Sequence, residues 1–319
     1  IGARAIRKEW PNTKLLLPHG DPGFVIPFLR RSPEARELID GVGLDMPQFE
    51  RMPESQLHQV TMHRLYQMNE EFRKIGKKPF LSMHEGTCPP TPPGALPWDE
   101  QADIYTRNFL FYFAYGVYRH PSGPTPFDCG NYWGEEHYGC CGLFYRIPWC
   151  NPKPSYVAYA TLSRHLNRAN FEKWISTGSL STYCMQFKHY KTGKLIHSLW
   201  TVRGKRPATL TVPAGAQITH FDEDDNATVL AVKDGRVTFT IDSSPCYVEG
   251  LAADPQVSLG ESDHSDSVPA ENAGKIGNLG DGSWKLVSQE DKTYENNHPF
   301  QMARFPGKMG AIVDEAPLQ

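Results

Sequence analysis

One short segment carries the residues with the clearest chemical potential in this chain. An apolar run at residues 79–83 (PFLSM) leads into His84, Glu85, Gly86 and Thr87, and a Pro-rich loop follows. Barrel enzymes keep their catalytic groups at the carboxyl ends of buried parallel strands. Glu85 is therefore our candidate nucleophile, and the alternative is an ordinary solvated glutamate at a strand end. We expect His84 to face the other way, because neighbouring strand residues alternate in direction.

Polar residues also accompany the two apolar segments that come earlier in the chain. His19 and Asp21 follow residues 14–18 (KLLLP), and Asp45 lies near the end of residues 39–46 (IDGVGLDM). Side chains of these types could hydrogen-bond the hydroxyl groups of a sugar. For His19 and Asp21 the alternative is a tight turn of the kind that Asp, Gly and Pro favour.

Three aromatic residues could supply a flat surface for a ligand. Trp133 and Tyr132 lie at the end of the first half of the chain, and Trp98 directly precedes a predicted helix. An aromatic face can cover the apolar face of a pyranose ring and leave its hydroxyls to polar neighbours. We favour Trp133 among the three, with a place in the hydrophobic core as its alternative.

The elements that must position these residues alternate between strand and helix. The predicted strands are residues 14–18, 39–46, 79–83 and 125–132, and the predicted helices are residues 33–38, 53–75, 99–118 and 154–167. This alternation indicates a parallel α/β sheet. It amounts to about four strand–helix units, which is half of a (β/α)8 TIM barrel. No G-x-G-x-x-G follows a strand, which argues against a dinucleotide-binding sheet.

From Gly178 onward the pattern changes from helical to alternating. The predicted strands are residues 183–190, 194–202, 208–212, 217–221, 228–232 and 236–241, with a two-residue turn at Asp234-Gly235. Short strands at this spacing indicate an antiparallel β-sandwich that ends near Leu251. Residues 252–281 are rich in Asp, Ser, Gly and Pro and are predicted to be a linker. Residues 282–319 are predicted to begin a further β module, a candidate carbohydrate-binding domain.

The composition excludes several classes of partner and cofactor. Lys plus Arg number 33 against 36 Asp plus Glu, a net charge of -3, which argues against a nucleic-acid-binding surface and a polybasic membrane anchor. No apolar run approaches the roughly 18 residues that suggest a membrane span. The seven cysteines form no C-x-x-C pair, and the cluster of Cys129, His137, Cys140 and Cys141 fits no strong zinc pattern. We therefore expect no metal and no cofactor.

The order of these segments resembles the C-terminal half of retaining (β/α)8-barrel glycoside hydrolases. The similarity rests on a strand ending in Glu, an aromatic-rich helix, a Trp-bearing last strand, the segment 152–156 (PKPSY) and a following sandwich. It is nearest to the group of β-xylosidases, α-L-iduronidases and related endoglucanases that append a β-sandwich to the barrel. Within it, residues 152–166 look like the last barrel helix, residues 187–201 like core strands of the sandwich and residues 245–251 like its closing strand.

The resemblance implies a domain organisation and an activity. The partial barrel would span residues 1–172, the sandwich 173–251, the linker 252–281 and the truncated module 282–319. The implied activity is hydrolysis of O-glycosidic bonds in a poly- or oligosaccharide with retention, and polysaccharide-degrading enzymes of this group imply a secreted or periplasmic protein. Glu85 would hold the place of the nucleophile at the end of the seventh barrel strand. The alternative is a noncatalytic carbohydrate-binding or scaffolding protein with a degenerate barrel.

A retaining enzyme needs a second carboxyl group, the acid/base. The resemblance places it in an Asn-Glu pair at the end of the fourth barrel strand. Asn69-Glu70 is the only such pair here, and it lies within a predicted helix. The first ten residues read as an amphipathic helix already under way, without an initiator Met. We therefore expect a fragment that is inactive alone, whose acid/base and N-terminal barrel half lie upstream of Ile1.

Overall fold

The structure is a computed structural model of the chain. It describes residues 2–17, 22–44, 53–54, 69–74, 80–83, 97–119, 142–144, 151–263, 285–287, 302–304 and 310–312. The chain forms two compact units, Ile1–Ser163 and Arg164–Gln319. None of the described helices is long and apolar enough to cross a membrane.

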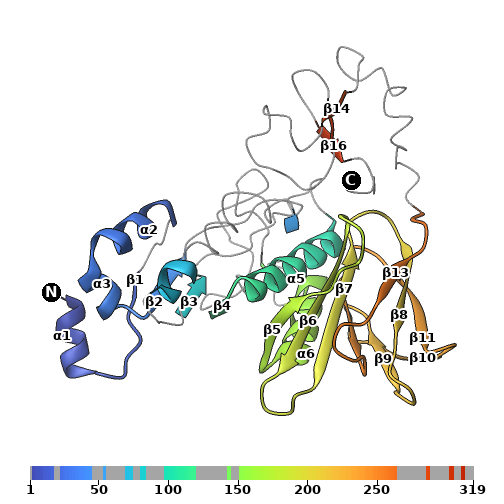
Figure 1. Ribbon diagram of the computed structural model, residues 1–319, viewed down its shortest axis with the longest axis horizontal. Coiled ribbons are helices and arrows are strands. Elements are labelled where there is room, and N and C mark those ends of the chain that lie inside the picture. Colours follow the sequence, from blue (N-terminus) through green and yellow to red (C-terminus); the bar gives the residue numbers. More distant parts are fainter. Residues whose placement is uncertain are drawn as a thin grey trace. The chain divides into compact units, whose positions relative to one another are not determined.

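The first unit contains a four-stranded sheet in which every neighbouring pair is parallel (Figure 1). The strands lie in chain order: β1 (Leu16–Leu17), β2 (Gly41–Leu44), β3 (Phe80–Met83) and β4 (Val117–Arg119). The first three fall within the segments predicted as strands. A parallel sheet whose strands follow chain order needs a crossover after each strand, and helices commonly supply it.

Helices precede or follow these strands, and one of them, at residues 22–31, was not predicted from the sequence. They are α1 (Gly2–Glu9), α2 (Pro22–Arg31), α3 (Pro33–Leu38), α5 (Trp98–Ala114) and α6 (Pro154–Leu166). The start of α3 has a clear local cause, because the Ser32 hydroxyl accepts a hydrogen bond from the backbone N–H of Ala35 (3.3 Å) and Pro33 occupies the first turn. Of the predicted helix at residues 53–75, only residues 53–54 and 69–74 are described, and residues 69–73 are helical.

The helix predicted at residues 99–118 extends too far at its C-terminal end. Residues 117–118 were expected to end the helix that began at residue 99, yet the helix ends at Ala114 and β4 starts at Val117. Between them Gly116 has a φ of +86°, and the Asn69 side-chain amide donates a hydrogen bond to the carbonyl oxygen of Tyr115 (2.6 Å). A side chain at position 116 would also press against that amide. The predicted strand at residues 125–132 lies outside the described residues.

The second unit contains two antiparallel sheets that share one hydrophobic core (Figure 1). The larger has the order β10-β9-β12-β7-β6-β5, and the smaller has the order β11-β8-β13. Their bounds are β5 Ala169–Trp174, β6 Thr182–His189, β7 Leu195–Thr201, β8 Arg206–Thr211, β9 Ile218–Phe221, β10 Ala227–Leu230, β11 Arg236–Ile241, β12 Cys246–Glu249 and β13 Val257–Leu259. Leu199 and Val248 of the larger sheet and Leu210 and Val237 of the smaller one belong to this core. β10 is the outer strand of the larger sheet and exposes Val229.

Local sequence accounts for the tight turns of these sheets. Asp234 and Gly235 both have positive φ, as the predicted two-residue turn requires. Gly250, which directly follows β12, has a φ of +96° and packs so closely on Gln217 that a Cβ atom would collide with its carbonyl oxygen. Only glycine fits both conditions at position 250.

Two strands extend this unit beyond its predicted limits. β5 pairs with β6, so the predicted boundary between residues 172 and 173 falls inside a strand. β13 pairs with β8 within residues 252–281, where a linker was predicted, so a sandwich ending near Leu251 ends too early. Three short strands form a further antiparallel sheet within residues 282–319: β14 (Lys285–Val287), β15 (Met302–Arg304) and β16 (Gly310–Ile312).

Candidate functional site

The carboxyl ends of β1 to β4 share one edge of the parallel sheet. Leu17 is aligned with Val42, Val42 with Leu81, and Leu81 with Val117. Leu44 and Met83, the last residues of β2 and β3, are also aligned. The four strands therefore end at the same edge of the sheet.

Most of the predicted site residues follow these strands in the sequence and lie outside the described residues. Glu85 follows the last residue of β3 by two positions, and Asp45 follows the last residue of β2 by one. His19 and Asp21 come two and four positions after the end of β1. Tyr132 and Trp133 also lie outside the described residues. The roles given to these six residues stay predictions.

Trp98 is the one predicted ligand-contacting residue that the structure describes. It is the first residue of α5, and its indole ring is half-buried. The ammonium group of Lys153, which is 1% exposed, lies 4.8 Å from the centre of that ring. This cation–π contact occupies one face of the indole. That face of Trp98 is therefore not available to a sugar ring.

The helix that follows Glu85 in the chain is buried on all sides over most of its length. Residues 101–112 of α5 are all buried, and several of them are polar or charged. Arg107 is 4% exposed, and its Nε lies 3.6 Å from the carboxylate of Glu54, which is 3% exposed. Breaking such a pair leaves an uncompensated charge in a low-dielectric interior. The helical periodicity of residues 99–118 indicated one buried face and so did not predict this pair.

Two further carboxylates of the first unit are held in their ionised form. Glu71 accepts hydrogen bonds from Arg30 and Lys74 (2.8 Å each), and the bond from Arg30 is the main reason that its pKa is lowered. Burial would raise the pKa of Asp40, but the backbone N–H of Leu15 and the guanidinium of Arg7 outweigh it, and the net shift is downward. The bond from Leu15 to Asp40 joins the residues that directly precede β1 and β2. Among the described residues no group of three or more His, Cys, Asp or Glu is arranged to hold a metal ion.

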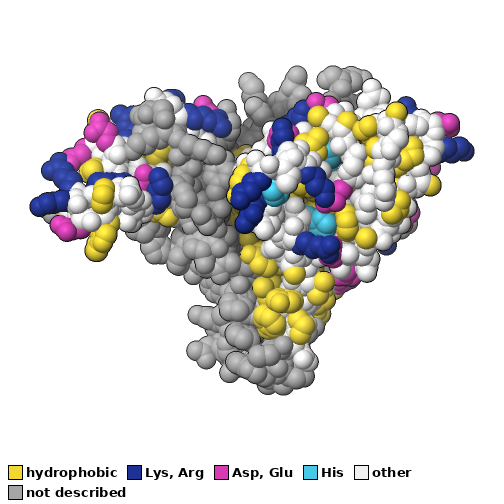
Figure 2. Space-filling model, turned by 90° about the horizontal axis from the view of Figure 1, so that it is seen from below, with side chains coloured by type: hydrophobic (Ala, Val, Ile, Leu, Met, Phe, Trp, Pro, Cys, Tyr) yellow, Lys and Arg dark blue, Asp and Glu magenta, His cyan; other side chains and the backbone are white. Residues whose placement is uncertain are grey.

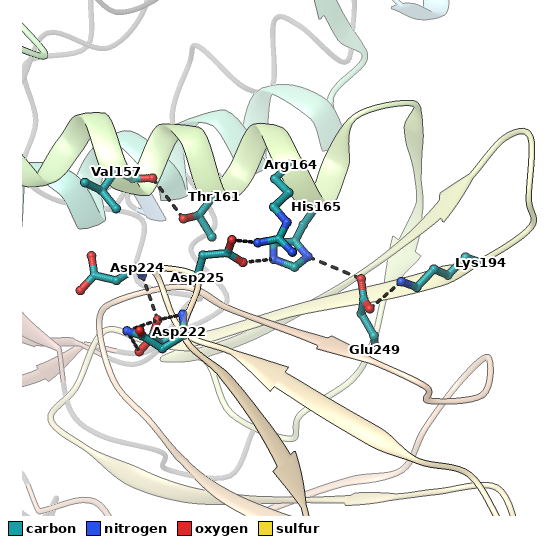
Figure 3. A network of polar contacts seen from close by, with 10 residues as sticks. Val157, Thr161, Arg164, His165, Lys194, Asp222, Asp224, Asp225 and Glu249 are labelled. Carbon is teal, nitrogen blue, oxygen red and sulfur yellow. Dashed lines mark hydrogen bonds and ion pairs between the residues drawn. The ribbon is translucent and has the colours of Figure 1, made fainter.

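A polar network in the second unit was not predicted from the sequence (Figure 3). His165, in the last turn of α6, is 4% exposed and lies between two carboxylates. Its Nε2 is 2.9 Å from Asp225 and its Nδ1 is 3.5 Å from Glu249. The ring of His165 is stacked on Tyr247 with centroids 4.9 Å apart. A lone histidine in a helix carries no sequence signal for such contacts, because both partners are distant in the chain.

Each carboxylate of this network has a second cationic partner. Arg164 pairs with Asp225, and Lys194 donates to Glu249 at 2.5 Å (Figure 3). The hydrogen bond from His165, followed by the Lys194 ammonium, lowers the pKa of Glu249 to about 2, against the burial that would raise it. The network therefore joins the end of α6 to β12 and to the loop before β10. The charged groups of this network pair with one another, so we assign the network a structural role.

Comparison with known proteins gives structural matches alone. No protein-family model and no curated protein matches the chain. Its fold is similar to that of a family 39 glycoside hydrolase from the gut symbiont Bacteroides cellulosilyticus WH2, with a TM-score of 0.60 and 18% identity over 78% of this chain and 53% of that one. The likeness to an Anoxybacillus α-amylase has a TM-score of 0.46 with 11% identity over 79% and 55% of the two chains. A family 44 xyloglucanase from Paenibacillus polymyxa gives 0.43 with 9% identity over 72% and 51%.

Of these three structures, only the family 39 structure has a TM-score above 0.5. At this identity it shows the fold, and the chain thus has a glycoside-hydrolase-like fold. The chain spans about half of the length of the solved structures that it matches.

Proposed function

We propose that this chain is the C-terminal part of a retaining glycoside hydrolase, with Glu85 as its nucleophile. The observation that carries the proposal is the place of Glu85, two residues after the third of four parallel strands whose carboxyl ends share one edge. In barrel enzymes that edge holds the catalytic groups. The four strands in chain order are read as half of a (β/α)8 barrel, and the likeness to a family 39 glycoside hydrolase supports this reading.

The proposed reaction is a double displacement on an O-glycosidic bond. The Glu85 carboxylate attacks the anomeric carbon while an acid/base carboxyl group protonates the leaving oxygen, and water then releases the sugar from the glycosyl-enzyme. The two carboxyl groups of a retaining enzyme lie about 5 Å apart. We place the acid/base in the barrel half that this sequence does not contain, since the chain spans about half of the family 39 structure. No metal or cofactor takes part in this scheme.

The remaining predicted residues are proposed to bind the sugar. His19, Asp21 and Asp45 follow β1 and β2 in the sequence. Their side chains are proposed to reach the same edge of the sheet and to hydrogen-bond sugar hydroxyls. Trp133 and Tyr132 are proposed as stacking surfaces. Trp98 is a weaker candidate, because Lys153 already covers one face of its ring.

The test is covalent trapping in the natural protein that contains this chain. A 2-deoxy-2-fluoro glycoside slows breakdown of the glycosyl-enzyme, and peptide mass spectrometry locates the label; we expect it on Glu85. Glu85→Gln should abolish labelling and lower kcat by at least about a thousandfold. The matched control is Glu261→Gln, which makes the same change at an exposed carboxylate. Near-normal turnover of Glu85→Gln, or a label elsewhere, would overturn the assignment.

A second measurement tests the role of the nucleophile directly. In Glu85→Ala, azide can occupy the space of the missing carboxylate and attack the anomeric carbon in a single displacement. The expected product is a glycosyl azide of inverted configuration. A glycosyl azide of retained configuration would identify Glu85 as the acid/base, and failure of every glycoside to react with the natural protein would favour a noncatalytic carbohydrate-binding protein.

A further inference from the structure

The hairpin between β6 and β7 has a tip whose shape is fixed by its own hydrogen bonds. The backbone N–H groups of His189 and Gly193 bond to the carbonyl oxygens of Lys194 and His189 (2.9 Å each). The Nδ1 atom of His189 accepts from the backbone N–H of Thr192 (3.1 Å), and the Thr192 hydroxyl lies 3.0 Å from the same atom. Gly193 supplies the positive φ that the turn needs. A ligand would meet a tip that is already ordered, which lowers the entropic cost of binding.

Tyr190 projects an aromatic ring from this tip. It is 60% exposed, and one side of its ring is stacked on His189 with centroids 5.8 Å apart and planes 9° apart. Its backbone N–H donates to the carbonyl oxygen of Arg168 (2.9 Å), the residue that follows the end of α6 by two positions. The contact places Arg168 beside the hairpin. An exposed tyrosine held against a second ring is a firm platform for a flat ligand.

Four basic residues lie near Tyr190 in the sequence or through its backbone hydrogen bond, and two of them have no ion-pair partner among the described residues. Arg168 and Lys191 are both exposed, and neither has an ion-pair partner among the described residues. The neighbouring Lys188 and Lys194 already lie against carboxylates of β5 and β12. Figure 2 shows Lys and Arg side chains close to histidines on one face of the molecule, with Asp and Glu side chains among them. Two exposed cationic residues are therefore next to Tyr190, Lys191 in the sequence and Arg168 through its backbone hydrogen bond.

We propose that this hairpin surface, formed by Arg168, His189, Tyr190 and Lys191, binds acidic oligosaccharides. A pyranose ring stacks on the open face of Tyr190, and the carboxylates of the sugar bind Arg168 and Lys191. The guanidinium of Arg168 has the planar fork that accepts a carboxylate through two hydrogen bonds. The site does not involve Glu85, so it goes beyond the hydrolase proposal and does not depend on it.

Charge balance favours a short acidic sugar over a nucleic acid. Across residues 164–263 acidic and basic side chains are equal in number, and residues 222–225 of the same unit are all acidic. Proteins that bind a nucleic-acid backbone neutralise many phosphates, often six or more. The two cations beside one ring match a few uronic acid units better than a long phosphate backbone.

The test is affinity electrophoresis of the full chain through native gels that contain polygalacturonate. We expect the wild-type protein to be retarded by polygalacturonate and to run freely in hydroxyethylcellulose, which is neutral. Lys191→Ala and Arg168→Asn should each weaken binding about threefold, and the double variant about tenfold, as expected for exposed charges. Asn is chosen at position 168 because it tolerates the positive φ found there. Tyr190→Ala should weaken binding about fivefold.

Matched controls distinguish this site from the other charged surfaces of the protein and from the proposed active site. Lys233→Ala removes an exposed lysine from a different hairpin and should leave the retardation unchanged. Glu85→Gln should also leave it unchanged, which keeps the outcome distinct from that of the hydrolase proposal. Equal retardation of wild type and the Lys191/Arg168 double variant would overturn the proposal. So would equal retardation in hydroxyethylcellulose, stronger retardation by single-stranded DNA, or loss of retardation in Glu85→Gln.

Discussion

Replacing Glu249 by Gln should destabilise the second unit in a way that depends on pH. The variant keeps the shape of the side chain and removes the charge that faces His165 and Lys194. Because the pKa of Glu249 is lowered in the folded state, its ionised form stabilises the fold. That stabilisation is complete above the ordinary pKa of 4.5 and is lost as the pH falls towards 2.

The size of the effect follows from the same pKa. A fall from 4.5 to about 2 corresponds to about 3.4 kcal/mol at neutral pH. The Glu249 side chain is 20% exposed, so water screens part of its interactions, and we expect a loss of about 2 kcal/mol. By the same linkage, about two fifths of the full effect should remain at pH 3.

Urea unfolding followed by tryptophan fluorescence at pH 7, 5 and 3 measures this difference, because Trp174 and Trp200 lie in the same sheet as Glu249. The control Glu261→Gln should cost less than about 0.5 kcal/mol at every pH, since its side chain is exposed. If Glu249→Gln matches the wild type at pH 7, the Glu249 charge does not stabilise the fold. If the difference in stability is the same at pH 3 as at pH 7, the loss does not come from ionisation of Glu249.

Two other features give expectations of the same kind. Gly250→Ala should lower the free energy of unfolding by at least about 2 kcal/mol, because a Cβ atom would collide with the backbone of Gln217. Gly178 also has positive φ but has open space around it, so Gly178→Ala should lower it by about 1 kcal/mol in the same urea experiment. Equal losses in the two variants would contradict the collision. Burial raises the pKa of Cys246 to about 12 and that of Cys184 further, so both thiols should resist Ellman's reagent until the protein unfolds. Rapid labelling of either cysteine in the native protein, located by peptide mass spectrometry, would show that this core opens.

Elements with a local cause were predicted well. β3 follows from a short apolar run bounded by Pro79 and a polar segment, and α3 follows from Ser32 and Pro33 at its start. The hairpin turn at Asp234 and Gly235 needs only its own two residues. In each case the sequence within a few positions contains the whole reason for the structure.

Elements that depend on distant contacts were placed wrongly or overlooked. Val117 continues the apolar stripe of α5, so the sequence predicted that the helix would include it. The side chain of Asn69 bonds the carbonyl oxygen of Tyr115 at the end of the helix, and Asn69 is 46 positions earlier in the chain. β13 has only Val257 and Leu259 as its apolar residues, and its partner β8 decides that it is a strand. The polar composition around β13 therefore predicted a linker, because it does not reveal the pairing with β8.

The candidate site shows the same division. Glu85 could be picked out because the strand before it has a local signal. The buried pair of Arg107 and Glu54 could not, because helical periodicity reports one buried face and α5 is covered on all sides. His165 and its carboxylates come together only when α6, β12 and the loop before β10 are in place.

The outer strand β10 has a consequence for how copies of this protein behave at high concentration. Its far side has no strand partner among the described residues, and Val229 on it is 62% exposed. An open edge with an apolar side chain is a template for pairing with another molecule, which leads towards aggregation. Residues 222–225, just before β10, are all Asp or Glu. Their negative charge raises the free energy of placing a second edge alongside, so salt, which screens that charge, should make concentrated solutions of this protein aggregate faster.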